Sequence, residues 1–373
     1  MIRHLYVHVP FCLRRCSYCD FAVQAVPHAP VDDWIRSVTG EFDLIAAEQG
    51  WTARPELHTL YLGGGTPSLI GGAGLREFAQ RLCERVELAP DCEWTVEANP
   101  ETFTEDVAQE WARAGVNRIS LGAQSFNEEV LRWMGRMHGA DGPARAVAAA
   151  RNAGLENFSL DLIFALPSRF QRDWRYDLEA VLALEPAHVS LYGLTAEPGT
   201  PLGRWVAEGR ESMASEDEYA EQYLLAARVL TDAGFVHYEV SNFARPGRES
   251  RHNQAYWNGS AYLGLGPGAH SLLPPLRRWN VREWSDYRER IRQGHPAVEG
   301  SEVLGPGTAS LEDAWLGLRT QAGVALERLS ERQLSLTRSW TSRGWGVTQA
   351  DAFRLTAEGW LLLDRLSVEI ASA

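Results

Sequence analysis

The sequence has no long hydrophobic run and no excess of positive charge. The first absence argues against a membrane-spanning protein, and the second argues against a general nucleic-acid-binding protein. Nowhere do about 18 apolar residues follow one another, so a membrane-spanning helix is not expected. The N-terminal stretch MIRHLYVHVP passes directly into alternating apolar residues, without the charged and apolar regions of a signal peptide. With 36 Lys and Arg against 49 Asp and Glu, the net charge of −13 gives no general attraction for nucleic acid. We therefore expect a cytoplasmic protein without stable membrane insertion; a transient membrane association would leave no mark in the sequence.

Cysteine is scarce, and its distribution excludes a secreted disulfide framework. Of five cysteines, Cys83 and Cys92 stand alone, while Cys12, Cys16 and Cys19 form a C-x3-C-x2-C array. Small secreted proteins instead carry an even set of paired cysteines. In a reducing compartment clustered thiols more often bind metal, so the array is a candidate metal site.

Six short apolar runs rich in β-branched and aromatic residues predict buried strands. They span residues 5–9, 59–65, 93–99, 117–124, 158–167 and 188–195. Helix-like segments lie between them, at residues 31–50, 71–86, 104–115, 142–154 and 171–184. This alternation indicates a parallel sheet covered by helices. Periodicity does not distinguish an open doubly wound sheet from a full or partial barrel.

Polar residues or glycines lie at or just after the C-terminal end of each predicted strand. These features are the cysteine array, Gly63 to Pro67, Glu97, Gln124 followed by Arg136, Asp161, and Tyr192 with Gly193. The C-terminal ends of parallel strands form one rim, where ligands of β/α folds bind. We therefore expect one large ligand to span the strand ends.

The cysteine array has three interpretations. Iron–sulfur clusters usually take four cysteine ligands and structural zinc also takes four ligands, whereas this spacing supplies three. A cluster on three cysteines would leave one iron open to a substrate or cofactor. The alternatives are a zinc site completed by His8 or Asp20, and three thiols that bind nothing.

The other rim residues also have structural alternatives. Glycines 63–65 either form a tight turn or let a ligand approach the backbone. Glu97 can be a solvated or salt-bridged carboxylate, the commoner fate of acidic residues. Asp161 lies between two leucines in an apolar strand, where a buried carboxylate needs a partner. Sugar hydroxyls or a cationic amine would serve, as would Arg118 or Arg136.

The chain resembles the radical S-adenosylmethionine (SAM) enzymes in three features. They are the cysteine array with Tyr18 before its last cysteine, the GGGTP loop and the polar strand ends. More narrowly, the chain resembles their coproporphyrinogen III dehydrogenase and heme chaperone group, from LYVHVPFC to the C-terminus. This resemblance implies a partial (β/α)6 barrel in which Cys12, Cys16 and Cys19 hold a 4Fe-4S cluster. The amino and carboxylate groups of SAM would chelate the fourth iron. The positions implied to contact SAM are Tyr6, Tyr18, Gly64, Gly65, Thr66, Glu97, Gln124, Arg136, Asp161 and Gly193.

Two departures separate the branches of this group. The dehydrogenases have the pattern C-x3-C-x2-C-x-C and a long N-terminal extension. This chain instead has Phe21 at the position of the last cysteine, and few residues precede its first strand. The heme chaperone branch resembles this chain in its C-x3-C-x2-C-x-F pattern and in an H-N-x-x-Y-W motif, present as HNQAYW at residues 252–257. The resemblance implies heme binding and delivery to apo-hemoproteins such as respiratory enzymes, with no residue in a catalytic role.

The HNQAYW motif supplies the candidate heme contacts His252, Tyr256 and Trp257. Histidine and tyrosine are known axial ligands of heme iron, and a tryptophan can pack against a porphyrin face. In a helix, His252 and Tyr256 would lie on one face, a turn apart. The alternative is a hydrogen-bonded histidine with an aromatic pair filling a domain junction. His270, in GLGPGAHS, is a rival iron ligand; the alternative for this glycine-rich loop is that it completes the SAM pocket.

We expect three domains: the barrel with the cluster and SAM sites at residues 1–210, an α/β extension carrying HNQAYW at 211–300, and a small winged-helix-like domain at 301–373. The last rests on two helical pieces, residues 311–329 and 353–373, around a turn-rich stretch. The sequence leaves open whether the chain forms a homodimer. Two other functions compete: oxygen-independent coproporphyrinogen III dehydrogenase, and a structural metal protein without SAM cleavage or heme. The polar strand ends argue against the latter.

Overall fold

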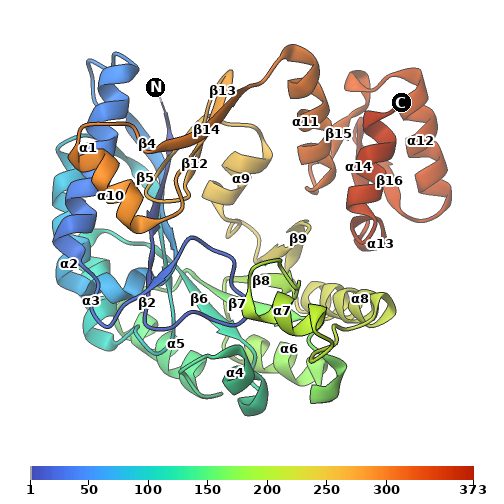
Figure 1. The fold of residues 1–373 in the computed structure, drawn as a ribbon. Helices are drawn as coiled ribbons and strands as arrows, with labels where there is room; N and C mark the ends of the chain where they lie inside the picture. Colours follow the sequence, from blue (N-terminus) through green and yellow to red (C-terminus); the bar gives the residue numbers. More distant parts are fainter. Residues whose placement is uncertain (1) are drawn as a thin grey trace.

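One twelve-stranded sheet dominates the computed structural model, which describes residues 2–373 (Figure 1). The strand order is β14-β13-β12-β11-β1-β4-β5-β6-β7-β8-β10-β9. Its six central strands are parallel: β1 (His4–Val9), β4 (Glu56–Gly64), β5 (Glu87–Ala98), β6 (Arg118–Gln124), β7 (Phe158–Phe164) and β8 (His188–Gly193). These are the six predicted strands, adjacent in chain order. The sheet is open at both edges, which confirms the partial barrel.

Helices alternate with the central strands and cover their outer face (Figure 1). They are α1 (Val31–Glu48), α2 (Gly71–Cys83), α3 (Glu105–Ala114), α5 (Gly142–Asn152) and α6 (Trp174–Ala183), each matching a predicted helix. Side-chain caps fix two of the starts, because Thr104 and Asp173 accept hydrogen bonds from backbone N–H groups of the first turn. Sequence reasoning missed α4 (Glu128–Met134), which follows β6 and is capped by Asn127.

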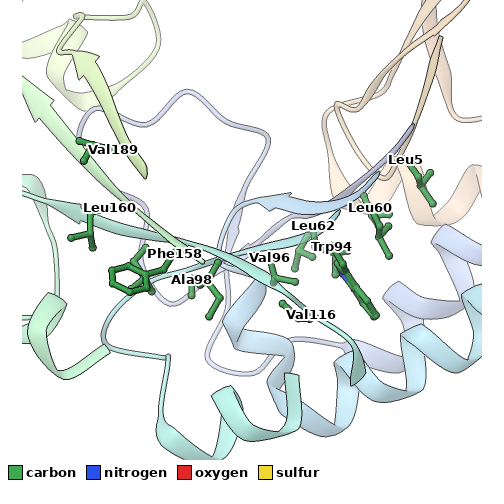
Figure 2. Packing of buried hydrophobic residues seen from close by; sticks show 14 of the residues in the cluster. Leu5, Leu60, Leu62, Trp94, Val96, Ala98, Val116, Phe158, Leu160 and Val189 are labelled. Carbon is green, nitrogen blue, oxygen red and sulfur yellow. The ribbon is translucent and has the colours of Figure 1, made fainter. Parts of the chain in front are cut away.

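The main core lies between the sheet and these helices. Figure 2 shows Leu60 and Leu62 of β4 beside Trp94 and Val96 of the neighbouring strand β5, with Leu160 of β7 farther along the same core; all five are at most 1% exposed. Strands of a parallel sheet are mostly buried, which is why they appear in the sequence as nearly continuous apolar runs. Here the helices cover one face of the sheet, and residues of the other face and of the strand ends line the cavities described below.

Further strands extend the sheet at both edges. At one edge β11 (Tyr262–Leu265) pairs parallel with β1, and β12 (His270–Leu273), β13 (Leu276–Asn280) and β14 (Val298–Val303) follow antiparallel. At the other edge β8 pairs with β10 (Asn242–Ala244), and β10 with β9 (Val236–Glu239). The connecting helices are α7 (Pro201–Ala207), α8 (Glu216–Asp232), α9 (Arg251–Trp257) and α10 (Trp284–Arg292). The extension therefore continues the barrel sheet, and the domain boundaries at residues 210 and 300 stay predictions.

The C-terminal residues form a smaller unit around a three-stranded antiparallel sheet of β15 (Val324–Ala325), β17 (Ala352–Leu355) and β16 (Gly346–Gln349). Its helices are α11 (Pro306–Leu318), α12 (Glu331–Ser342), α13 (Ala357–Trp360) and α14 (Leu363–Ala371). This composition fits the winged-helix-like expectation, although residues 353–355 are strand and the turn-rich stretch contains α12. Among residues 2–373, no helix has the length and apolar character needed to cross a membrane.

Candidate functional site

The C-terminal ends of the central strands surround a cavity of about 510 Å³, here called the cysteine cavity. Its wall contains the three cysteines and nine of the ten positions implied to contact SAM. They are Cys12, Cys16, Cys19, Tyr18, Gly64, Gly65, Thr66, Glu97, Gln124, Arg136, Asp161 and Gly193. Tyr6, the exception, lines a neighbouring cavity. The fold thus brings widely separated parts of the chain to one site.

The three cysteines lie in the segment that runs from β2 (Phe11–Cys12) to β3 (Gln24–Ala25), each partly buried. The Thr66 hydroxyl donates to Cys12 Sγ at 3.4 Å, and Arg136 Nη1 donates to Cys16 Sγ at 3.9 Å. Burial raises the pKa of the Cys12 thiol to about 11 and also raises the pKa of Cys19. These thiols therefore need a compensating cation, such as a metal cluster, to ionise near neutral pH.

His8 is not free to complete a zinc site. Its Nδ1 lies 2.9 Å from the Tyr6 hydroxyl and its Nε2 lies 2.8 Å from the Ala22 carbonyl oxygen. The other candidate, Asp20, forms an ion pair with Arg282 at 3.4 Å. Within residues 2–373, no three His, Cys, Asp or Glu side chains are gathered as the ligands of a single ion would be. Three thiols spread over one cavity wall fit the donor set of an iron–sulfur cluster, in which each thiolate binds a different iron.

The GGGTP glycines allow close packing of the chain against itself. A Cβ on Gly64, whose φ is +111°, would lie 2.2 Å from the His8 ring, and a Cβ on Gly65 would lie 2.7 Å from the Phe11 carbonyl oxygen. The Gly65 N–H donates to the Val9 carbonyl at 2.8 Å. The glycines therefore hold the start of the cysteine segment against the end of β4, besides lining the cavity.

Glu97 is held at the end of β5 by two donors. It accepts a hydrogen bond from the Tyr61 hydroxyl at 2.7 Å and another from the Gly64 N–H at 2.9 Å. Burial raises the pKa of its carboxyl to about 7. Its charge near neutral pH is therefore sensitive to a cationic or hydrogen-bonding ligand in the cavity.

The buried partners of Asp161 are hydroxyls. The Ser120 hydroxyl donates to its carboxylate at 2.9 Å and the Ser159 hydroxyl donates at 3.2 Å. Arg118, one candidate partner, instead donates to Asn157 at 3.1 Å and to a backbone carbonyl. Burial raises the pKa of Asp161. An amine or hydroxyl donor from a ligand would favour its charged form.

Gln124 ends β6 in the left-handed region, with φ of 65°. Its Oε1 is buried in the cavity wall without a hydrogen-bond partner. A buried acceptor left without a donor costs about 1–3 kcal/mol. This acceptor therefore fits a ligand that carries a donor, as the amine and ribose hydroxyls of SAM do.

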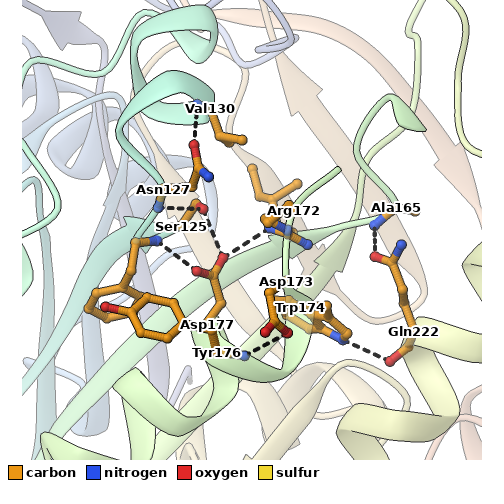
Figure 3. Close-up of polar contacts among 12 residues, drawn as sticks. Ser125, Asn127, Val130, Ala165, Arg172, Asp173, Trp174, Tyr176, Asp177 and Gln222 are labelled. Carbon is orange, nitrogen blue, oxygen red and sulfur yellow. Dashed lines mark hydrogen bonds and ion pairs between the residues drawn. The ribbon is translucent and has the colours of Figure 1, made fainter. Parts of the chain in front are cut away.

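Figure 3 shows the buried network that fixes the backbone after Gln124. Asp177 of α6 accepts hydrogen bonds from the Ser125 hydroxyl at 2.8 Å and from the Phe126 N–H at 3.1 Å. Its carboxylate also pairs with Arg172 at 3.1 Å, and both charged side chains are buried. Burial lowers the pKa of Arg172 to about 10, so the guanidinium stays charged near neutral pH.

Asn99, which sequence reasoning missed, connects two of the cysteines. Arg136 Nη2 donates to Asn99 Oδ1 at 2.7 Å, and Asn99 Nδ2 donates to the Thr66 hydroxyl at 3.0 Å. Because Thr66 reaches Cys12 and Arg136 reaches Cys16, one chain of hydrogen bonds spans the array. The available signal was the place of Asn99 at the end of a predicted strand.

The HNQAYW motif forms most of α9, so His252 and Tyr256 do lie one turn apart. His252 is 1% exposed; its Nδ1 lies 2.7 Å from the Thr59 hydroxyl and its Nε2 lies 2.8 Å from the Tyr256 hydroxyl. Burial lowers the pKa of its imidazole to about 3, so the ring is neutral. Tyr256 and Trp257 reach a second cavity of about 950 Å³, here called the aromatic cavity. His252 does not line it.

The two cavities adjoin. Asp20, Phe21, Gly64 and Glu97 line both of them. Phe21 is 64% exposed and is one of these shared residues. The residue that distinguishes the C-x-F pattern therefore lies between the cysteine cavity and the aromatic cavity.

A family model and a solved structure both match this chain. The family model of the radical SAM superfamily matches residues 6–181, which include the cysteine array. The coproporphyrinogen III oxidase HemN from Escherichia coli superposes with a TM-score of 0.83, covering 99% of this chain and 90% of that chain. With 22% sequence identity, this likeness concerns the fold alone.

Relatives of higher sequence identity cover most of the chain. The heme chaperone HemW of Mycobacterium tuberculosis is 38% identical over 96% of this chain and 92% of its own length. HemW of Escherichia coli is 39% identical over 72% of this chain and 70% of its own length. The mitochondrial radical S-adenosyl methionine domain-containing protein 1 of Mus musculus is 36% identical over 96% of this chain and 82% of its own length. The chain therefore belongs to the radical SAM superfamily and, within it, to the HemW heme chaperone family.

Proposed function

We propose that this chain binds heme and delivers it to apo-hemoproteins such as respiratory enzymes, while it carries a 4Fe-4S cluster that coordinates SAM. The observation that carries the proposal is the aromatic cavity, which contains Tyr256 and Trp257 of the HNQAYW motif and adjoins the cysteine cavity. Its volume of about 950 Å³ is at the upper end of the roughly 300–1,000 Å³ found for ligand pockets, which suits a large ligand. The HemW relatives, named as heme chaperones, support the same function. We also propose a cytoplasmic location with transient membrane association.

In this proposal Cys12, Cys16 and Cys19 hold the cluster, which supplies one-electron chemistry and an open iron for the amino and carboxylate groups of SAM. The Gln124 Oε1 accepts a hydrogen bond from SAM, and Glu97 and Asp161 accept from its amine or hydroxyls. The remaining SAM contacts are Tyr18, Gly64, Gly65, Thr66, Arg136 and Gly193 on the cavity wall and Tyr6 beside it.

Heme transfer from the reconstituted protein tests this function. The chain is reconstituted anaerobically with iron and sulfide, loaded with heme, and mixed with an apo-hemoprotein. After separation, heme on each protein is measured as its pyridine complex, with free heme at equal concentration as the control. We expect stoichiometric binding by the chain and faster transfer than from free heme. Absence of stoichiometric binding, or of transfer, contradicts the proposal.

Oxygen-independent coproporphyrinogen III dehydrogenase is the second candidate, because the adjoining cavities would also bring a porphyrinogen next to SAM. Phe21 argues against this candidate, because the dehydrogenase pattern has a fourth cysteine at that position. The test is an anaerobic assay with SAM, a reductant and coproporphyrinogen III, read by mass spectrometry. We expect no doubly decarboxylated product while a known dehydrogenase is active in parallel. Turnover would make the dehydrogenase the first candidate.

A further inference from the structure

We infer that heme lies in the aromatic cavity between α9, α11 and the β12–β13 hairpin, and that His270, rather than His252, binds its iron. This inference rests on the proposed heme-binding function and adds the location and the axial ligand. Both histidines are candidates from the sequence, but only His270 lines the cavity.

His252 is unsuited to bind iron in this arrangement. Both of its ring nitrogens are occupied, by the Thr59 hydroxyl and the Tyr256 hydroxyl. Its ring also stacks on Tyr61 of β4, with centroids 5.1 Å apart. To reach a heme iron, His252 would have to lose a hydrogen bond while it remains buried, which is costly. Its contacts instead hold α9 on β4 and orient the Tyr256 ring toward the cavity.

His270 has the opposite properties. It is the first residue of β12, its side chain is exposed, and no side-chain hydrogen bond within residues 2–373 engages its ring. Its imidazole stacks on Trp279, its partner in the β12–β13 register, with centroids 5.9 Å apart and an interplanar angle of 24°. A neutral imidazole with a free nitrogen, backed by an aromatic ring, is a suitable axial ligand.

The sheet face around His270 is suited to a flat apolar molecule. Side chains alternate along a strand, so Leu272 shares the face of His270, and the register places Arg277 opposite Leu272. Tyr262 of β11 is the other neighbour of Leu272. These four side chains all line the aromatic cavity. Helices α9 and α11 contribute Trp257, Trp315 and Leu316 to the same cavity, near the hairpin (Figure 1).

Two arginines provide partners for the two propionates of heme. Arg277 and Arg282 line the cavity. Partial burial lowers the pKa of His270, and the charges of these two arginines lower it further. Arg277 pairs with Glu302 at 2.9 Å and also with Glu312, while Arg282 pairs with Asp20 at 3.4 Å. A guanidinium has five N–H donors, so these pairs hold each arginine in place and leave donors for a propionate. Four acidic residues also line the cavity: Asp20 and Glu312, which pair with these arginines, and Glu97 and Asp313.

The experiment compares four proteins, all reconstituted with the cluster: wild type, His270→Ala, His252→Gln and His295→Ala. His295 is exposed and outside both cavities, so its variant is the matched histidine control. Each is titrated with hemin, and ferric heme is examined by electron paramagnetic resonance, where the oxidised cluster is silent. We expect His270→Ala to lose the histidine-ligated signal and to bind heme on the order of tenfold more weakly, or weaker still. Removing a side chain that only hydrogen-bonds to a metal ligand already lowers metal affinity by about 10–100-fold, and losing the ligand itself should cost at least as much. His252→Gln should keep the wild-type axial signal.

A ligand exchange makes the test independent of folding defects. His270→Cys should give the spectrum of thiolate-ligated ferric heme, with unchanged iron and sulfide content, because a thiolate is also an axial ligand. The wild-type axial signal in His270→Ala, or its loss in His252→Gln alone, would overturn the assignment of His270 while leaving heme binding intact. If the wild type binds no heme, the proposed function itself fails.

Discussion

At the scale of single residues, Asn99 shows how the cysteine site is held together. Its amide lies between Arg136 and Thr66, and these two reach Cys16 and Cys12. Removing the amide would leave a partly buried guanidinium N–H of Arg136 and the buried hydroxyl of Thr66 each short of a partner. Unsatisfied groups of this kind are costly, because they cannot return to water in the folded state.

We predict that Asn99→Ala lowers the free energy of unfolding by about 1–3 kcal/mol and reduces the iron bound per chain after reconstitution. The first effect follows from the lost hydrogen bonds, and the second from the looser attachment of the cysteine segment. Denaturant unfolding and iron analysis measure them. Asn152→Ala, at an exposed position of α5, is the control and should change neither. Unchanged iron content in Asn99→Ala would contradict the positioning role.

The sequence could identify strand-end residues but not their partners. Glu97, Gln124 and Asp161 were found because they follow or interrupt apolar runs, and parallel strands end at one rim. That Asp161 would accept from serines and not from Arg118 depends on distances across neighbouring strands, which no periodicity contains. His252 and His270 likewise differ only in what surrounds them, Thr59 and Tyr256 in one case and an open cavity in the other.

At the scale of elements, α6 supports the turn that follows β6. Asp177 on α6 binds the backbone and side chain of residues 125–126 and neutralises the buried Arg172. This carboxylate connects the helix, the turn and the guanidinium. Removing one partner of a buried ion pair leaves an uncompensated buried charge. This lowers the free energy of unfolding more than the loss of a single hydrogen bond does.

We predict that Asp177→Asn destabilises the protein by roughly 3–5 kcal/mol, because Asn keeps the shape of the side chain but leaves the Arg172 charge unpaired. The denaturant midpoint measures this loss. Asp173→Asn is the matched control: Asp173 caps α6, and Asn caps a helix as well as Asp does, so little change is expected. Equal effects of the two variants would argue against the buried ion pair.

Elements with a long periodic pattern were predictable, and short capped ones were not. The six central strands are apolar over most of their length, so composition alone identified them. Helix α4 is only seven residues long and depends on the Asn127 cap, and α12 begins with a capping box of Ser330 and Gln333 inside a stretch that reads as turns. The start of β5 at Glu87 also escaped prediction, because its polar first residues pair with β4 through an irregular register.

At the scale of the whole molecule, buried acids and buried histidines oppose one another in the response to pH. Burial raises the pKa of Glu41, Glu97 and Glu239 to about 7, and it lowers the pKa of His8 to about 4 and of His237 to about 3. A carboxyl with a raised pKa stabilises the fold at low pH and loses this effect as pH rises through its folded pKa. A histidine with a lowered pKa does the reverse, so single variants are needed to separate the two.

We predict that Glu239→Gln isolates one acidic contribution. Glu239 is fully buried in β9 where the sheet meets the C-terminal unit, beside Thr320. With a pKa near 4.5 unfolded and about 7 folded, its contribution is present below pH 4.5 and is lost as pH rises toward 8. Wild type should therefore lose about 2–3 kcal/mol relative to the variant between pH 5 and pH 8.

Denaturant unfolding at several pH values checks this difference. Glu179→Gln, at an exposed position of α6, is the control and should show a constant difference from wild type. A constant difference for Glu239→Gln as well would show that the Glu239 carboxyl is ionised in the folded protein at pH 5.

The shared wall of the two cavities has a thermodynamic consequence. Asp20, Phe21, Gly64 and Glu97 line both cavities, so a ligand bound against any of them in one cavity changes the surface that the other ligand meets. Binding free energies around a closed cycle must sum to zero, so any factor by which SAM changes the affinity for heme equals the factor by which heme changes the affinity for SAM. Where that factor differs from one, loading the chain with heme also regulates its occupancy by SAM.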